Sequence, residues 1–316
     1  MISLLKNFRL PHYLAIPLVG ALTSALITVT PVASLAHENH DAEVCSGFAP
    51  PNDLKIPVGA VHKWALADKF ANGGLSEEQF NAIIDRFERL YSDDFAKAGG
   101  TLRVIRGWDD ATVNASANRQ GSTWNVKMFG GLARHPATTL EGFALVLCHE
   151  AGHHIGGAPK YAGWGGRSWA TNEGGADYFA TLKCLRRLFS EDDNATIIAN
   201  SSIDSLAKER CEKEFSTRND QLLCMRNTLA SNSAALVLMD IRKEQTPPGF
   251  GTPDPKVVST TFDGHPATQC RMDTYFAGAT CHVDQTVPVS NGDYREGSCI
   301  QPQDLIGFRP LCWFKP

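Results

Sequence analysis

The chain contains the run Cys148-His149-Glu150-Ala151-Gly152-His153-His154, in which two histidines stand four residues apart with a glutamate after the first. On a helix this spacing places His149 and His153 on one face, where both imidazoles can bind one metal ion. Glu150 then lies about 100° around the helix axis, beside the remaining coordination positions. The pattern predicts a metal site in which Glu150 is a base and not a ligand.

The residues around this motif supply the helix that it requires. Thr138-Thr139-Leu140-Glu141 has the form of a capping box and precedes an apolar segment that leads into the motif. A second helical segment, from Glu173 to Phe189, carries Glu173 and Asp177 one turn apart. Glu173 can complete a set of two histidines and one glutamate, which is typical of catalytic zinc, and Asp177 can orient a ligand histidine. His154 points away from the ligand face, and we expect it to pack or to support the site.

The N-terminal residues predict export. The chain has 316 residues, 43% hydrophobic and 20% charged, which is a globular balance with material for one substantial core. Lys6 and Arg9 precede an apolar run, and Ser34-Leu35-Ala36 has the small residues that a signal peptidase reads. We expect a signal peptide at residues 1–36 and no stable membrane insertion after cleavage. An uncleaved anchor is the alternative.

The charge balance excludes one class of partner. The formal net charge is −4, and removal of Lys6 and Arg9 with the signal peptide would change it to −4 − 2 = −6. Phosphate attraction dominates nucleic-acid affinity, so a mildly acidic chain without a basic cluster binds nucleic acid poorly. We therefore expect a protein or peptide partner and no nucleic acid.

Nine cysteines follow residue 36, where an oxidising compartment would allow disulfides. Because the number is odd, at least one cysteine must stay unpaired or bond elsewhere. Spacing does not determine connectivity, and the simplest local bridges are Cys211–Cys224, Cys270–Cys281 and Cys299–Cys312. Cys148 is expected to be a buried small hydrophobe and not a metal ligand.

The remaining pattern divides the chain into segments. The first segment, residues 37–75, begins as a polar, Pro- and Gly-containing arm to which we assign no chemistry. The body of the protein follows at residues 76–245. The last segment, residues 246–316, is a Pro-rich linker and a cysteine-rich stretch without long helices. Within the body we expect a helix to about Lys97, an irregular glycine-rich loop over 156–166, and further helices near 195–216 and 219–244. Strands are expected at 101–106, 111–117 and 122–129, the last two as a hairpin.

Five segments together resemble the gluzincin metallopeptidases, specifically the family of the CAAX prenyl proteases and heat-shock membrane proteases, which has soluble periplasmic members. The likeness covers about residues 76–272. The segments are Val113 to Ala117, Trp124 to Leu132, His149 to His153, Glu173 to Asp177, and Gly264 to Thr268 with Arg271.

This resemblance implies an α+β fold, a mainly helical zincin-like domain with a small mixed sheet and the metal site on two core helices. It implies one Zn²⁺ per chain and a substrate laid as an added strand along Asn114, Ala115, Ser116 and Ala117. His265 becomes the candidate donor to the oxyanion, with Tyr275 as the second. The chain departs from the membrane-embedded members in having no catalytic transmembrane helices and in its cysteine-rich tail.

We therefore expect an exported, periplasmic or secreted, zinc-dependent metalloendopeptidase. The alternative is a catalytically silent, zinc-containing binding or scaffold protein, and a hydrolase of a non-peptide amide is a third possibility. The intact Glu150 favours a hydrolase, because a purely structural zinc site has no use for a base beside the metal.

Overall fold

The computed structural model describes residues 47–60, 63, 73–163 and 166–316. The expected signal peptide, its cleavage site and the start of the arm lie outside the described residues. The described residues belong to one compact unit. In the described part of the chain, no helix is both long and apolar enough to cross a membrane.

The fold is α+β with a small mixed sheet, as expected. The sheet has the order β1-β3-β2, with β1 parallel and β2 antiparallel to β3. The strands are β1 (Thr101–Gly107), β2 (Ala115–Gln120) and β3 (Thr123–Phe129), so the predicted hairpin is confirmed as β2 and β3. Because β2 pairs on one side only, it is an edge strand of this sheet.

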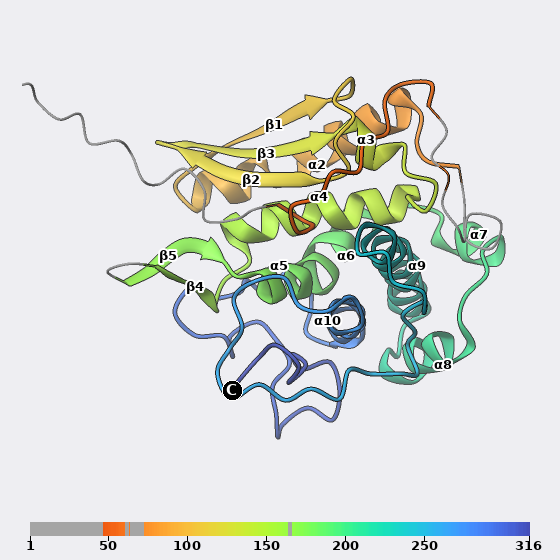
Figure 1. Ribbon diagram of the computed structural model, residues 1–316. Coiled ribbons are helices and arrows are strands. Elements are labelled where there is room, and N and C mark those ends of the chain that lie inside the picture. The colour runs from red at the N-terminus through yellow and green to blue at the C-terminus, as the bar shows by residue number, and fades with distance from the viewer. Residues whose placement is uncertain (1–46, 61–62, 64–72, 164–165) are drawn as a thin grey trace, which may run out of the picture. The chain divides into compact units, whose positions relative to one another are not determined.

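Helices make up most of the regular secondary structure outside this sheet. Figure 1 shows α4 beneath the sheet, with α5, α9 and α10 on the opposite side of α4. The helices are α2 (Glu77–Lys97), α3 (Gly130–Ala133), α4 (Leu140–Ile155), α5 (Glu173–Phe179), α6 (Leu185–Leu188), α7 (Asn194–Ala199), α8 (Ser205–Glu214), α9 (Arg218–Ile241) and α10 (Thr268–Thr280).

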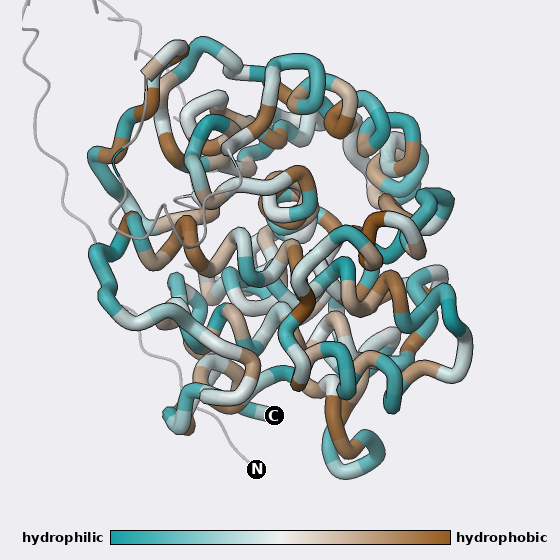
Figure 2. Tube along the Cα trace, turned by 90° about the vertical axis from the view of Figure 1, so that its right-hand side faces the viewer, coloured by the Kyte–Doolittle hydropathy of each residue, from teal (hydrophilic) through white to brown (hydrophobic). Residues whose placement is uncertain are grey.

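The position of α4 follows from its composition. Residues 142–154 are all buried, which suits a helix enclosed by the sheet on one side and by helices on the other. Gly152 allows a close approach to α5, since a Cβ there would lie 3.1 Å from backbone atoms of Ala176. On the surface, the capping box of Ser76 and Gln79 begins the predicted amphipathic helix α2. Figure 2 shows hydrophobic and hydrophilic residues mixed along such outer segments.

Three segments differ from the sequence-based expectation. The glycine-rich loop contains a hairpin of β4 (Lys160–Gly163) and β5 (Gly166–Thr171). The second metal-bearing helix is interrupted after α5 by a π-helical segment, η1 (Ala180–Cys184), before α6. The tail holds the 13-residue helix α10. Here tertiary packing against buried partners overrides weak local signals.

Four disulfides tie the helical part together: Cys148–Cys184, Cys211–Cys224, Cys270–Cys312 and Cys281–Cys299. The Cys211–Cys224 prediction is confirmed, whereas the two tail pairings are wrong because α10 separates Cys270 and Cys281 by its own length. Cys148 is buried, as expected, and its unpredicted bridge to Cys184 joins α4 to η1. The ninth cysteine, Cys45, lies outside the described residues. Several disulfides are typical of an oxidising, extracytoplasmic compartment.

Candidate metal centre

Three side chains that can ligate a metal meet between α4 and α5: His149, His153 and Glu173, all fully buried. The Nε2 atoms of the two histidines are 3.2 Å apart. The Glu173 carboxylate oxygens lie 3.3 Å from Nε2 of His149 and 3.7 Å from Nε2 of His153. Tetrahedral ligands at about 2.0–2.1 Å from zinc are about 3.3 Å from one another, so this spacing fits a cation of that size.

The other ring nitrogen of each histidine faces a fixed acceptor. Nδ1 of His149 lies 2.7 Å from Oδ1 of Asp177, and Nδ1 of His153 lies 2.7 Å from the carbonyl oxygen of Thr171. A carbonyl oxygen can only accept, so the proton of His153 is on Nδ1 and its Nε2 carries the lone pair that a metal needs. Such fixed acceptors orient ligand histidines in metal sites.

Arg271 on α10 holds Asp177 in place. Its Nε and Nη2 atoms donate to the two carboxylate oxygens at 2.8 and 2.7 Å, and both side chains are fully buried. A buried carboxylate is costly without such a partner. The motif residues therefore depend on an arginine that lies 122 positions after His149. The sequence gives one signal for it, the resemblance of the Gly264 to Arg271 segment.

The charge states of Glu173 and His153 suit a cation, whereas His149 must release a proton when a metal binds. Burial alone would lower the pKa of His149, but the Asp177 carboxylate raises it to about 9. Burial lowers the pKa of His153 to about 4. Burial also acts to raise the pKa of Glu173, yet its bond to His149 and the charge of His153 bring that pKa well below its usual value. Near neutral pH Glu173 is anionic and His153 neutral, the forms that bind metals.

Glu150 lies beside the cluster and differs from the other carboxylates. It is fully buried, and neither of its carboxylate oxygens has a hydrogen-bond partner among the described residues. Burial raises its pKa to about 8, against the opposing charge of His149. Buried polar atoms without partners are rare and often mark chemistry. A carboxylate whose pKa is close to neutral can both take up and release a proton.

Two more side chains approach the cluster. The Tyr161 hydroxyl donates to Oε1 of Glu173 at 2.8 Å. Nε2 of His265 lies 3.4 Å from Oε2 of Glu173 and donates to the carbonyl oxygen of Gly47 at 2.6 Å. Burial lowers the pKa of His265. Tyr275, the second oxyanion candidate, is buried in α10, and burial raises its pKa well above the usual value.

The N-terminal arm, to which the sequence assigned no chemistry, lies against these residues. Phe48 and Ala49 are fully buried, and the Phe48 ring meets the His149 imidazole edge to face at 5.6 Å between centroids. Arg271 donates to the Phe48 carbonyl oxygen and places its guanidinium 4.6 Å from the Phe48 ring centroid. Phe48 and Ala49 therefore belong to the interior of the protein and contact the candidate metal centre.

The expected substrate strand lies at the same place. The Asn114 side chain accepts from Ala49 N at 2.9 Å and donates to Ala49 O at 3.0 Å, and Ala115 O accepts from Phe48 N at 3.1 Å. Ser116 and Ala117 continue along β2 and pair with β3. The arm thus already bonds the beginning of the edge at which the resemblance places a substrate.

Two other groups of metal-ligating residue types occur in the described residues. They are Asp254 with Cys270 and Cys312, and His282 with Cys299 and Asp304. Every cysteine in these groups is in a disulfide and cannot supply a thiolate. His135 bonds Asp240 at 2.9 Å on the far end of α9 and joins no such group. The His149, His153 and Glu173 cluster is thus the candidate metal centre.

No protein-family model matches this sequence, and no curated protein or solved structure matches it. The resemblance to the gluzincin peptidases therefore rests on the motif residues named above.

Proposed function

We propose that this protein is a zinc-dependent metallopeptidase whose centre is formed by His149, His153 and Glu173. The observation that carries the proposal is the buried cluster of these residues with an unpartnered Glu150 beside it. A site that only stabilised the fold would have no use for a buried carboxylate without a partner. Zinc bound there would lower the pKa of a coordinated water towards about 7.

The residues of the chain then have separate tasks. Glu150 takes the proton of the attacking water and delivers it to the leaving amine, which its pKa of about 8 allows. His265 donates to the oxygen of the scissile carbonyl, since its Nε2 already donates to the Gly47 carbonyl. Asp177 and Arg271 hold His149 so that Nε2 faces the site.

A peptide substrate is favoured over another amide by what lies against the site. Gly47, Phe48 and Ala49 are a stretch of peptide, bonded through its backbone to His265, Arg271 and Ala115. The site therefore recognises main-chain atoms of a polypeptide, as expected of a peptidase that adds its substrate to a sheet edge. Polypeptide chains, cut at internal peptide bonds, are the proposed substrate class.

The test uses the mature chain loaded with zinc and a peptide library read by mass spectrometry. Glu150→Gln is expected to keep about one zinc per chain and to lose at least about a hundredfold in turnover. Glu141→Gln is the control, because Glu141 lies in the first turn of the same helix and pairs with Arg226. Equal turnover in the Glu150 and Glu141 variants would refute the mechanism. A wild type that holds zinc and cleaves nothing would favour the silent scaffold.

A further inference from the structure

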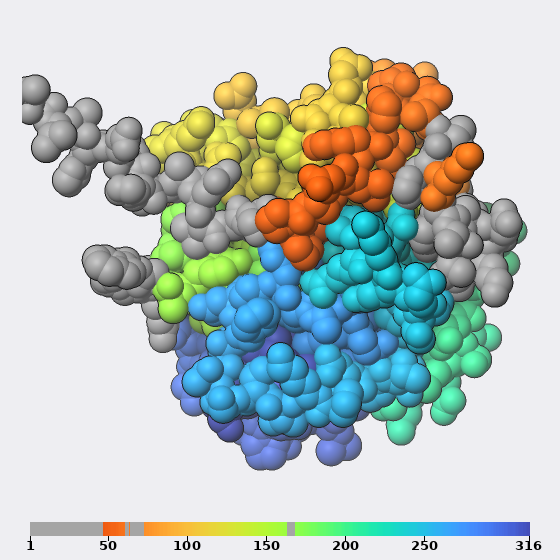
Figure 3. Space-filling model, viewed as in Figure 1, coloured from red at the N-terminus to blue at the C-terminus, as the bar shows by residue number. Residues whose placement is uncertain are grey.

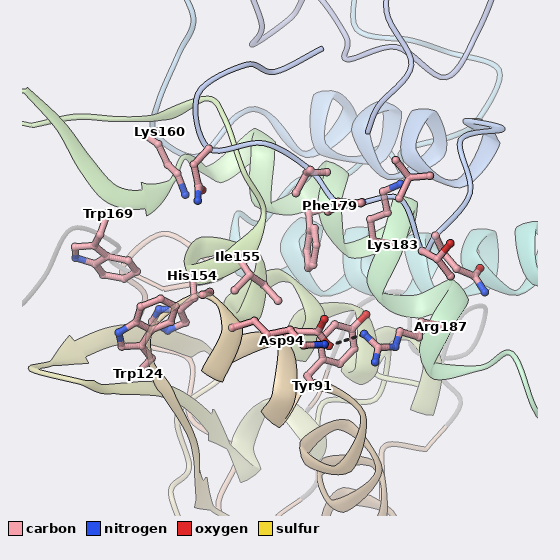
Figure 4. A pocket seen from close by; sticks show the side chains of 18 of the residues that line it. Tyr91, Asp94, Trp124, His154, Ile155, Lys160, Trp169, Phe179, Lys183 and Arg187 are labelled. Carbon is pink, nitrogen blue, oxygen red and sulfur yellow. Dashed lines mark hydrogen bonds and ion pairs between the residues drawn. The ribbon is translucent and has the colours of Figure 1, made fainter. Parts of the chain in front are cut away.

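A large cavity lies on the other side of the C-terminal part of α4 from the metal cluster. It has a volume of about 920 Å³, within the range of small-molecule sites. Residues from α2, β2, β3, α4, the β4 and β5 hairpin, η1 and the loop 285–291 line it. Figure 4 shows Trp124, His154 and Trp169 together near one end, and Lys183 and Arg187 near the other.

The charges that line this cavity are mostly positive. Five cationic side chains contribute, Lys97, Arg119, Lys160, Lys183 and Arg187, against the single carboxylate of Asp94. Asp94 pairs with Arg187 at 2.6 Å. In the described part of the chain, the other four cations have no carboxylate within 4.0 Å. A protein with a formal net charge of −4 thus concentrates unpaired positive charge in one cavity.

Aromatic side chains line the end of the cavity that Trp124 and Trp169 share with His154. His154 stacks between Trp124 and Trp169, with centroid distances of 5.5 and 4.9 Å and interplanar angles of 14°. The Arg119 guanidinium lies 3.3 Å from the Trp124 ring centroid. Lys160 is beside them and donates to the Thr171 hydroxyl at 3.1 Å. The stack fixes Arg119 and leaves its charge unpaired by any carboxylate.

The centre of the cavity is apolar, and polar atoms around it lack partners. Figure 4 shows Ile155 and Phe179 between the ring stack and Lys183. Nε1 of Trp169 and Oε1 of Gln285 are buried without a hydrogen-bond partner among the described residues. Both residues line the cavity. Such atoms indicate a site shaped for a polar occupant.

We propose that this cavity binds a small, elongated anion with negative groups at both ends and an apolar centre. Arg119 and Lys160 bind one end, Lys183 with Arg187 binds the other, and Ile155 and Phe179 contact the centre. Burial, together with Arg119, lowers the pKa of Lys160 to about 8, and burial with Arg186 does the same for Lys183. A bound anion reduces the repulsion between these positive charges.

The test is calorimetric titration of the mature chain with succinate, adipate and suberate, each beside the matching uncharged diol. The tryptophan fluorescence of Trp124 and Trp169 reports the same binding. At least one diacid is expected to bind, and Lys160→Gln and Lys183→Gln to weaken it about tenfold each. Lys208→Gln on exposed α8 is the control. Diols that bind as well as diacids, no binding at all, or Lys160 and Lys183 variants equal to the control would overturn the proposal.

A second inference comes from the arm and rests on the proposed function. Phe48 N donates to Ala115 O, Val113 N donates to Leu54 O, and Ile56 N donates to Ala111 O at 2.8 Å. The arm therefore follows the edge of residues 111–115, where a substrate strand is expected. Figure 3 shows this segment in orange between the yellow strands and the blue C-terminal part.

The first residues of this segment contact the metal cluster. The Gly47 carbonyl accepts from His265, the proposed oxyanion donor, and the Phe48 ring meets the ligand His149 edge to face. We infer that residues 47–56 occupy the substrate position and keep the enzyme latent until they are displaced. A substrate must compete with a segment tethered to the same chain, which has a high effective concentration.

Two glycines of the arm provide a matched test. Gly47 has φ +108°, and a Cβ there would lie 2.4 Å from the Ala115 carbonyl oxygen, so Gly47→Ala must move the arm off the edge. Gly59 has φ +77° with no atom within 4 Å, so Gly59→Ala carries a comparable backbone cost without the clash. Removal of bound zinc by a chelator measures access to the cluster without any need for turnover.

Gly47→Ala is expected to speed zinc removal and turnover about tenfold, while Gly59→Ala leaves both unchanged. Asn114→Ala, which removes both bonds to Ala49, is the second loosening variant and should speed zinc removal alike; turnover is not its readout, because Asn114 also belongs to the expected substrate strand. Faster zinc removal without turnover in any variant would refute the peptidase and keep the occlusion. Zinc removal equal in all three variants and wild type would refute the occlusion and leave the peptidase untouched.

Discussion

The two faces of helix α4 are built from the same short run of sequence and carry opposite chemistry. One face presents His149 and His153 to a buried carboxylate, and the chain's own arm lies against it. On the other side, His154 stands among aromatic rings and cations at a large cavity. Neighbouring positions in the sequence therefore reach environments of opposite charge, because a helix turns by about 100° per residue.

The two faces of α4 obtain their charges from different parts of the chain. The metal side gathers Glu150, Glu173 and Asp177, and Arg271 donates to the last of these carboxylates. The cavity side gathers cations from strands and helices that are distant in sequence. A cation is attracted to the first and an anion to the second. A substitution on one face should therefore leave the ligand affinity of the other face unchanged.

The largest effect is expected from a comparison of two histidines of the motif, His149 and His154. His149→Ala removes one metal ligand and should weaken zinc affinity by about a thousandfold, since the binding energy of such sites is shared among few ligands. His154→Phe keeps a ring in the stack but loses the bond to the Asn125 carbonyl oxygen at 3.0 Å. Its zinc affinity should stay within about twofold of wild type. Competition with a chromophoric chelator measures both, and equal losses would show that the two faces are not independent.

The next largest effect is expected from the disulfide that joins α4 to η1. Cys148–Cys184 closes a separation of 36 residues between α4 and η1, and its removal by double alanine substitution should cost about 3–4 kcal/mol in unfolding free energy. Cys211–Cys224 closes 13 residues between α8 and α9, and its removal should cost about 3 kcal/mol. Urea unfolding checks both. Only the first variant should also lower zinc affinity, so unchanged affinity would mean that α4 and α5 keep their spacing without the bridge.

A smaller effect is expected behind the metal cluster. Asp177→Asn keeps the shape of the side chain and removes the charge that faces His149 and Arg271. Zinc affinity should fall by about ten- to a hundredfold, as for other partners of ligand histidines. Asp94→Asn is the control on the cavity side, because Asp94 pairs with Arg187 and should leave zinc affinity unchanged. Isothermal titration distinguishes these outcomes, and an unaffected Asp177 variant would refute its orienting role.

The metal side was largely predictable from the sequence for a physical reason. His149 with His153, and Glu173 with Asp177, are each one helical turn apart, so helix geometry alone fixes which side chains share a face. The structure brings the first three within ligand distance of one another. The capping box of Ser76 and the hairpin of β2 and β3 are equally local signals; the helix begins where it was expected, whereas β2 lies a few residues later than predicted.

The rest could not be predicted, because it depends on contacts between distant segments. Gly47 meets His265 across 218 positions, and nothing in the polar arm marks that contact. The cavity likewise combines Lys97, Arg119, Lys183 and loop 285–291, none of which forms a cluster in the sequence. The tail pairings failed for the same reason, since the nearest cysteines lie on opposite ends of a helix that the sequence did not indicate.

The smallest effect is a pH dependence confined to the cavity side. The pKa values of Lys160 and Lys183 are about 8, lowered first by burial and then by Arg119 and Arg186, while the Asp284 charge acts to raise that of Lys183. A diacid binds the protonated lysines, so affinity is full below pH 8 and falls as the pH rises through 8 and the lysines lose their protons.

If loss of one lysine charge weakens binding tenfold, each lysine accounts for about a fivefold loss of affinity between pH 7 and 9. Titration of the diacid at several pH values measures this, and Lys160→Gln should remove about half of the logarithmic change. Arg119 stays charged throughout, since burial lowers its pKa only to about 10. A flat profile in the wild type would mean that the arginines alone bind the anion, and that the lysines of this face serve its packing.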